Sequence, residues 1–174
     1  SPFGVATYGD RVYVTSQDGV YVFDADEGGY IDHWGTKGSK AGQYDFPNGI
    51  AADSNNGNIY VADSLNRRVV ALTPEGKVRW MLGVFSEGNA SVFQLPRGIA
   101  VGPDGRIFVS DTHSHKIVVV DPDCKLLSIF GQRGTADAQL SFPEGIAISP
   151  SYRLYLADRQ NDRVQIWQLS EDVP

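Results

Sequence analysis

The sequence FPNGIAADSNNGNIYVADSLNRRVVALTPEGKVRWMLG, from Phe46 to Gly83, contains four short runs rich in aliphatic, β-branched and aromatic residues. Glycine, asparagine, aspartate and proline separate the runs, and these residues favour turns because they tolerate positive φ or bond to the local backbone. No sustained 3.6-residue apolar period, the sign of an amphipathic helix, runs through the stretch. The stretch therefore predicts four strands, at 49–53, 58–63, 68–72 and 77–82.

The same pattern recurs along the whole chain of 174 residues. Related segments begin at Pro2, Pro47, Pro96 and Pro143, at spacings of 45, 49 and 47 residues. A repeat of this length with four strands is typical of a propeller blade. We predict an all-β propeller of four four-stranded antiparallel blades with few helices. The predicted blades are 1–46, 47–95, 96–142 and 143–174.

One apolar face of each blade should pack against the neighbouring blade. The strand pattern predicts eight mostly buried positions: Ile50, Val61, Val69, Ile99, Val109, Ile117, Ile146 and Leu156. An aromatic residue also recurs at one position of the second strand, at Tyr13, Tyr60, Phe108 and Tyr155. We interpret this set as packing between blades.

The repeated residues resemble the NHL repeat. The shared features are the Gly-Ile-Ala start, the Ile-Tyr-Val-Ala-Asp strand, the Asn-x-Arg-Val entry to the third strand, and linkers that end in Phe-Pro-x-Gly. The resemblance covers essentially the whole chain and is weakest in the first unit, where TSQDGV is two residues shorter than ADSLNRRV. It implies a β-propeller, usually of six blades, that acts as a binding scaffold, although a fold does not fix a function.

The predicted ring lacks a clasp. The first unit opens at its innermost strand and the fourth ends after the run Arg163–Leu169, so fifteen blade strands are expected. Because an unpaired blade edge is a template for another chain, we expect the remaining blades of a larger propeller, or a protein partner, to cover the ends.

Composition excludes several function classes. Lys and Arg number 15 and Asp and Glu 21, and the resulting charge of −6 disfavours a nucleic-acid partner, even though NHL propellers include RNA binders. No apolar run approaches the roughly 20 residues that cross a bilayer, so no membrane insertion is expected. The single Cys124 allows no internal disulfide. The start SPFGVATYGD has no leader, which suggests a processed chain, and the family resemblance favours an extracytoplasmic location.

A polar motif recurs where the second strand of each good repeat ends. It combines an aspartate, an Asn or Ser three residues later, and a cation two residues beyond that. Since the pattern repeats, we interpret it as structural, with the acid pairing with the cation and the middle residue bonding to the turn. The members are Asp63, Asn66 and Arg68; Asp111, Ser114 and Lys116; and Asp158, Asn161 and Arg163.

The position before each repeat's glycine varies from blade to blade. Since the first strand of a blade lines the central channel, Asn48, Arg97 and Glu144 should ring one mouth of it together with Phe3. We take Asn48, Arg97 and Glu144 as candidate ligand-binding residues. His113 and His115 have spacing compatible with a metal pair but lie in a loop that is ordinary surface in the other repeats, so no metal site is expected there.

Two functions are compatible with these patterns. The favoured one is a non-enzymatic binding or scaffold module without a cofactor, because no nucleophile, base or metal cluster converges in the sequence. The alternative starts from a resemblance of residues 47–64 to gluconolactonase-like propellers, which implies that Asn48 helps to hold a divalent cation such as Ca²⁺. Glu144 could then add an oxygen ligand in a metal-dependent lactonase or esterase, although Arg97 would oppose the cation.

Overall fold

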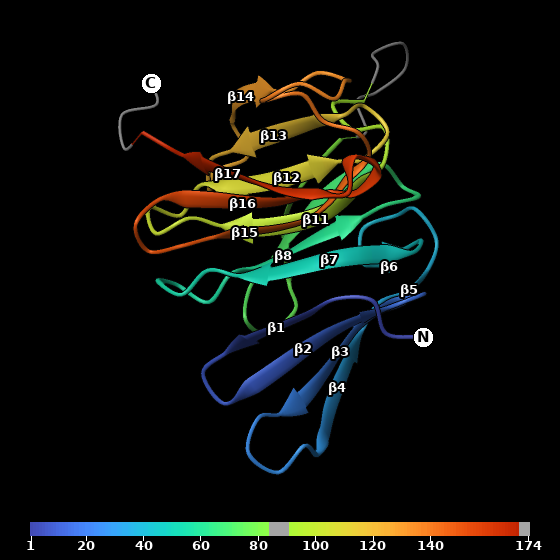
Figure 1. The fold of residues 1–174 in the computed structure, drawn as a ribbon. Helices are drawn as coiled ribbons and strands as arrows, with labels where there is room; N and C mark the ends of the chain where they lie inside the picture. The colour runs from blue at the N-terminus through green and yellow to red at the C-terminus, as the bar shows by residue number, and fades with distance from the viewer. Residues whose placement is uncertain (84–90, 171–174) are drawn as a thin grey trace.

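A computed structural model describes residues 1–83 and 91–170, and Figure 1 shows the sheets following one another in chain order. The first sheet contains β1 (Val5–Tyr8), β2 (Arg11–Ser16), β3 (Gly19–Asp24) and β4 (Tyr30–Trp34). The second contains β7 (Pro47–Ala52), β8 (Ile59–Asp63), β9 (Arg68–Leu72) and β10 (Val78–Leu82). The third contains β11 (Pro96–Val101), β12 (Ile107–Asp111), β13 (Lys116–Val120) and β14 (Leu126–Phe130). The fourth contains β15 (Pro143–Ile148), β16 (Arg153–Asp158) and β17 (Arg163–Gln168).

Each sheet is an antiparallel meander in which strands consecutive in sequence are neighbours. Fifteen blade strands are present in the described residues, the number predicted, and the fourth sheet has three. The described part of the chain contains no α-helix, only the 3-10 turn η1 (Arg159–Asn161), and no helix there could span a bilayer. The predicted all-β fold of four-stranded antiparallel sheets is therefore confirmed.

The linkers between sheets contain structure that the sequence did not predict. A short parallel pair joins β5 (Thr36–Lys37) to β6 (Gln43–Tyr44), and an isolated parallel bridge joins Arg133 to Leu140 in the corresponding linker before the fourth sheet. These contacts fold each linker back on itself. Two-residue pairings leave no recognisable apolar pattern, which is why the sequence did not reveal them.

The core lies between successive sheets. One apolar cluster joins the first and second sheets, another the second and third, and another the third and fourth. Seven of the eight positions predicted to be mostly buried are buried, and Ile146 on β15 is half-buried where it packs against the cluster of the third and fourth sheets. Tyr13, Tyr60 and Phe108 are buried in the three clusters, whereas Tyr155 in the fourth sheet is half-buried.

The inner strands approach one another closely: β1 contacts β7, β7 contacts β11, and β11 contacts β15. Glycine makes this approach possible, because a Cβ at Gly98 would overlap the Glu144 carbonyl oxygen and one at Gly49 would overlap the Arg97 carbonyl oxygen. Gly145 occupies the same position on β15, and its nearest neighbour to an added Cβ is the Ala157 Cβ at 3.7 Å. The fourth sheet thus has the glycine, Gly145, but no following inner strand lies close to it in the described residues as β11 does to Gly49 and β15 to Gly98.

Candidate functional site at the channel mouth

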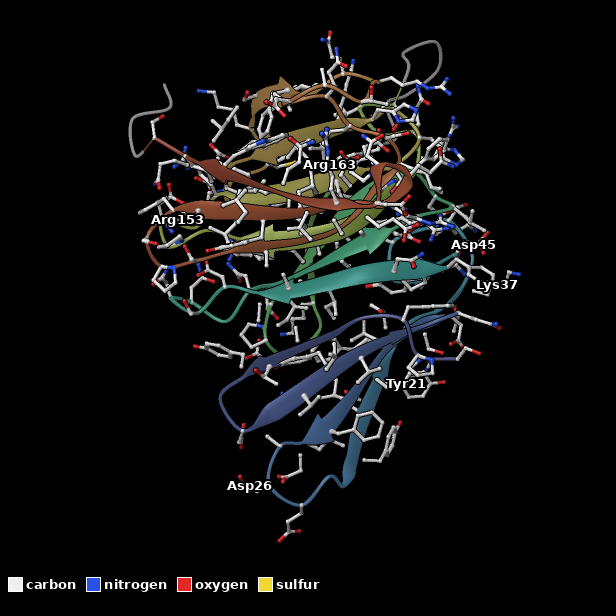
Figure 2. All side chains as sticks on the ribbon, viewed as in Figure 1. Tyr21, Asp26, Lys37, Asp45, Arg153 and Arg163 are labelled. Carbon is white, nitrogen blue, oxygen red and sulfur yellow. The ribbon has the colours of Figure 1, made fainter. Side chains whose placement is uncertain are left out.

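A pocket of about 220 Å³, open to solvent, lies where the four inner strands begin. It brings together the residues predicted to ring the channel mouth, although they come from four different sheets. Its lining consists of Phe3, Gly4, Asn48, Gly49, Arg97, Gly98, Glu144 and Gly145. On this side of the molecule Figure 2 shows Lys37 and Asp45, while Arg153 lies on the opposite side.

Backbone irregularities aim the variable side chains at the mouth. The pairing register of the inner strand shifts between Pro47 and Ile50, between Pro96 and Gly98, and between Pro143 and Ile146. Asn48, Arg97 and Glu144 lie within these three shifts. A β-bulge is known to re-aim a side chain at the end of a strand, so the repeated bulge presents a different residue from each blade to one pocket.

The charged members of the mouth form a connected group. Arg97 Nη1 lies 3.2 Å from Glu144 Oε1, and Arg159 Nη1 lies 3.0 Å from the same oxygen. Arg159 was not among the predicted site residues, because it follows the second strand and not the inner one. Its position one residue after Asp158, where the other repeats have Ser64 and Thr112, is the only sequence signal that marks it.

Asn48 faces its own blade. Its Nδ2 donates to the Phe46 carbonyl oxygen at 3.3 Å and to Ser64 Oγ at 3.1 Å. The side chain therefore holds the turn between linker and strand, and only its remaining surface lines the pocket. The pocket chemistry accordingly depends mainly on Arg97 and Glu144, with Arg159 held on the same Glu144 oxygen.

Hydroxyl groups join successive blades just below the mouth, a feature that sequence reasoning missed. Thr15 Oγ1 donates to the Asn48 carbonyl oxygen at 2.6 Å, and Thr112 Oγ1 donates to the Pro143 carbonyl oxygen at 2.7 Å. Ser64 and Ser110 make equivalent bonds to the carbonyls of Pro96 and Glu144. The sequence pattern that could have revealed these bonds is a Ser or Thr at one of two repeat positions at the end of the second strand. Thr15 and Ser110 occupy one position, and Ser64 and Thr112 the other. These bonds fix the spacing of the strands around the mouth.

The repeated polar motif ties each linker to its blade. In the second sheet, Asn66 Nδ2 and Arg68 Nε both donate to Asp63 Oδ2 at 2.8 Å. The Arg68 guanidinium then donates to three linker carbonyls, those of Ser39, Lys40 and Gln43. The motif therefore does not only form an ion pair beside its own turn. Through Arg68 it also holds the linker that leads to the channel mouth.

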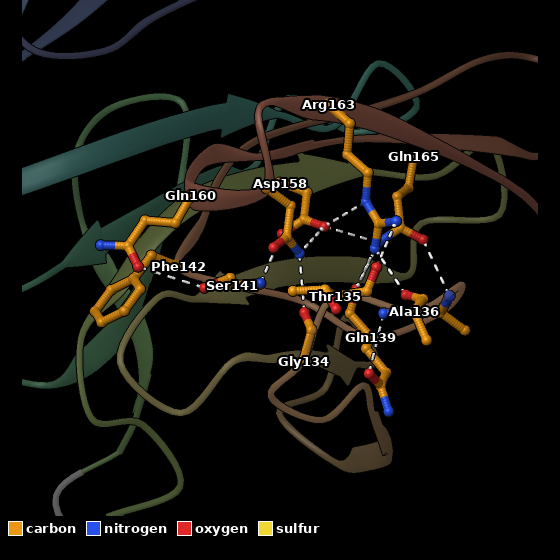
Figure 3. Close-up of polar contacts among 12 residues, drawn as sticks. Gly134, Thr135, Ala136, Gln139, Ser141, Phe142, Asp158, Gln160, Arg163 and Gln165 are labelled. Atoms are coloured by element: carbon orange, nitrogen blue, oxygen red, sulfur yellow. Dashed lines mark hydrogen bonds and ion pairs between the residues drawn. The ribbon is translucent and has the colours of Figure 1, made fainter.

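The fourth sheet repeats this cluster, drawn in Figure 3. Asn161 Nδ2 and Arg163 Nε donate to Asp158 Oδ2 at 2.8 and 2.9 Å, and the Arg163 guanidinium reaches the carbonyls of Thr135, Ala136 and Gln139. Burial raises the pKa of the Asp158 carboxyl, but hydrogen bonds from Ser141, Asn161, Arg163 and Gln165 outweigh burial and hold it below its usual range. The carboxylate is thus the form that this cluster stabilises.

The third sheet keeps only part of the motif. Ser114 Oγ donates to Asp111 Oδ2 at 2.6 Å, and the backbone amides of Gln94 and Leu95 donate to the same carboxylate. Lys116 is exposed, and no ion pair joins it to Asp111 within residues 1–83 and 91–170. Lysine lacks the planar fork with which Arg68 and Arg163 reach several carbonyls at once.

Comparisons with known proteins agree with this architecture. A family model described as a 6-bladed beta-propeller matches residues 3–75, and a model of the NHL repeat matches residues 93–120. The chain therefore contains an NHL repeat and has the sequence features of a β-propeller. NHL repeat-containing protein 2 of Bos taurus is 33% identical over 95 residues, which are 48% of this chain and 13% of that protein. Protein brain tumor of Drosophila melanogaster is 27% identical over 134 residues, 75% of this chain and 12% of that protein.

Solved structures share the fold of this NHL-repeat chain at low sequence identity. A chain in the nidogen/laminin complex superposes with a TM-score of 0.75 at 21% identity, covering 97% of this chain and 60% of that one. A streptogramin B lyase superposes with a TM-score of 0.71 at 15% identity, covering 99% of this chain and 56% of that one. The chain therefore spans just over half the length of these two propellers, and a much smaller share of the two curated relatives.

The two loop histidines of this NHL-repeat chain have different environments. His113 is exposed, whereas His115 is buried and its Nδ1 accepts a hydrogen bond from the Phe142 amide at 3.1 Å. Burial lowers the pKa of His115, which keeps the imidazole neutral at pH 7. In the described ranges no three His, Cys, Asp or Glu side chains gather in a way that could hold a metal ion.

Proposed function

We propose that this chain is a non-enzymatic binding module, a rigid set of blades that docks a further propeller blade at each open end and presents the channel mouth to a ligand. The observation that carries the proposal is the exposure of two apolar blade faces that are buried wherever a neighbouring blade is present. Rigid repeat scaffolds of this kind offer binding surfaces formed by several repeats together.

The first open face belongs to the fourth sheet. Val164 and Ile166 on β17 are 64% and 58% exposed. The equivalent residues of the second sheet, Val69 and Ala71, are fully buried against the third sheet, and Ile117 and Val119 of the third sheet are buried against the fourth. In the part of the chain that the structure describes, β17 is also the outermost strand of its sheet, which leaves its edge for pairing.

The second open face belongs to the first sheet. Val5 on β1 is 65% exposed, while Ile50, at the same place on β7, is 6% exposed because the first sheet covers it. The face of the first sheet that carries Val5 therefore corresponds to the face that every later sheet presents to the blade before it. The open face of the first sheet is therefore the kind of face that would pack against the open face of the fourth sheet.

A propeller blade is the occupant that fits these faces. Gly145 reserves the space that Gly49 and Gly98 use for the carbonyl of a following inner strand. Propellers of the solved structures extend beyond the share that this chain covers, which is consistent with further blades. In the isolated chain, the first sheet of a second copy is the available substitute, and it would add head to tail.

Replacing Ile166 with aspartate should prevent this head-to-tail association. A charge at the centre of the open face opposes burial there, yet the exposed side chain contributes little to folding of the monomer. Sedimentation equilibrium should show concentration-dependent association of the parent chain and a monomer for Ile166→Asp. The control Ile129→Asp changes a residue that is 44% exposed on β14, away from the open faces, and should associate like the parent. A parent chain that stays monomeric at every concentration would contradict the proposal.

The observations give less support to a metal-dependent lactonase or esterase. Two guanidinium groups contact the carboxylate that would have to bind the cation, and Asn48 donates its amide to Ser64 and Phe46. Cations beside Glu144 oppose a divalent ion electrostatically. We therefore propose binding without a resident metal.

A further inference from the structure

The channel mouth has an unbalanced charge. Arg97 and Arg159 both contact one oxygen of Glu144, and Glu144 is the only carboxylate that lines the pocket among the described residues. Arg97 and Glu144 line the pocket and balance each other, and Arg159, which does not line it, adds a second cation on the same Glu144 oxygen. The three side chains together carry +1, although the whole chain carries −6, and this local positive charge favours an anionic ligand beside them.

Arg97 also has a donor without an acceptor. Its Nε is buried and has no hydrogen-bond partner among the described residues, while its Nη1 bonds to Glu144. A buried donor left unpaired costs free energy because it has lost its bond to water. An acceptor that enters the pocket and reaches this edge of the guanidinium would recover that cost.

The geometry points to a monoanionic carboxylate as the ligand: we propose that the channel mouth binds a carboxylate attached to an apolar body, through Arg97 with Arg159 beside it. An arginine offers two parallel N–H donors that match the two oxygens of a carboxylate. The single charge of a carboxylate balances the +1 carried by Arg97, Arg159 and Glu144 together, whereas a phosphate dianion would exceed it and meet stronger repulsion from Glu144. The Phe3 ring supplies an apolar surface for the carbon skeleton.

This inference deepens the proposed function and rests on it, since it names the ligand class of the mouth of the same binding module. It does not depend on the open blade faces. The two proposals can fail separately. If carboxylate binding fails, while the parent chain still self-associates and Ile166→Asp prevents that association, this inference is removed and the module proposal stays in place.

The test uses benzoate as the probe and the ¹⁵N–¹H resonance of Arg97 Nε as the readout. Benzoate should shift that resonance saturably, the neutral isostere benzamide should not, and inorganic phosphate should bind at least several-fold more weakly. Glu144→Gln should strengthen phosphate binding more than benzoate binding, because it removes the repulsion. N-acetylphenylalanine, a mimic of a peptide C-terminus, should bind more tightly than benzoate if the natural ligand is a peptide end and equally if it is a small acid.

Variants separate specific recognition from general charge. Arg97→Gln should weaken benzoate binding about tenfold or more, since a charge-assisted pair contributes about 1.5–3 kcal/mol. Because this variant lacks the Arg97 resonance, its binding is measured from the backbone amide resonance of Gly98. The matched control Arg133→Gln removes an exposed cation from a linker and should leave binding unchanged. Equal shifts with benzamide, tighter binding of phosphate than of benzoate in the parent chain, or unchanged binding in Arg97→Gln would each overturn the proposal.

Discussion

Replacing Arg68 with alanine is expected to destabilise the chain by about 3–5 kcal/mol, because it leaves a buried carboxylate without its cation. The Asp63 side chain is fully buried and that of Arg68 is 4% exposed, and they are joined at 2.8 Å. The same substitution removes donors from the carbonyls of Ser39 and Gln43, each at 2.6 Å. Urea unfolding should report the loss as a lower midpoint, and Arg68→Lys should recover only part of it.

Lys116→Ala provides the matched control, since Lys116 occupies the same place in the third sheet. It is exposed and has no ion pair with Asp111, so its removal should change the unfolding free energy by no more than about 0.5 kcal/mol. Similar small losses for both variants would show that the Asp63 cluster does not secure the linker.

Gly98→Ala is expected to cost about 3 kcal/mol, the upper end of the usual range for overpacking. The added Cβ would overlap the Glu144 carbonyl oxygen of the neighbouring inner strand, and a backbone atom held between two sheets cannot move aside as a flexible side chain would. The spacing of β11 and β15 would have to increase. Chemical unfolding of the purified variant measures this loss.

Gly145→Ala tests the same substitution at a strand that no later inner strand contacts within residues 1–83 and 91–170. Its Cβ would lie 3.7 Å from the Ala157 Cβ, an ordinary contact, so the isolated chain should tolerate it within about 0.5 kcal/mol. If Gly98→Ala proved as harmless as Gly145→Ala, close contact between inner strands would not explain the repeated glycine.

The repeat period predicted the sheets well because strand alternation and turn residues are local signals. It also placed Asn48, Arg97 and Glu144 at one mouth, since equivalent positions of successive blades meet around a common axis. Their common pocket follows from symmetry and needed no side-chain detail.

Side-chain contacts between distant parts of the sequence were not predictable in the same way. Arg68 bonds to carbonyls 25 to 29 residues away, and backbone acceptors carry no mark in a sequence. The contact of Arg159 with Glu144, within the fourth sheet, depends on where η1 places the Arg159 side chain relative to β15. Such non-local hydrogen bonds are decided by three-dimensional packing, which overrides local propensity.

Mixing two variants that are each blocked at one end tests the central claim that the open faces are complementary blade-docking surfaces. Ile166→Asp blocks the fourth sheet and Val5→Asp blocks the first, so each variant alone should sediment as a monomer. Their mixture retains one intact face of each kind and should form a one-to-one dimer that does not grow further. A mixture that remains monomeric while the parent chain associates, or single variants that still associate, would contradict this account.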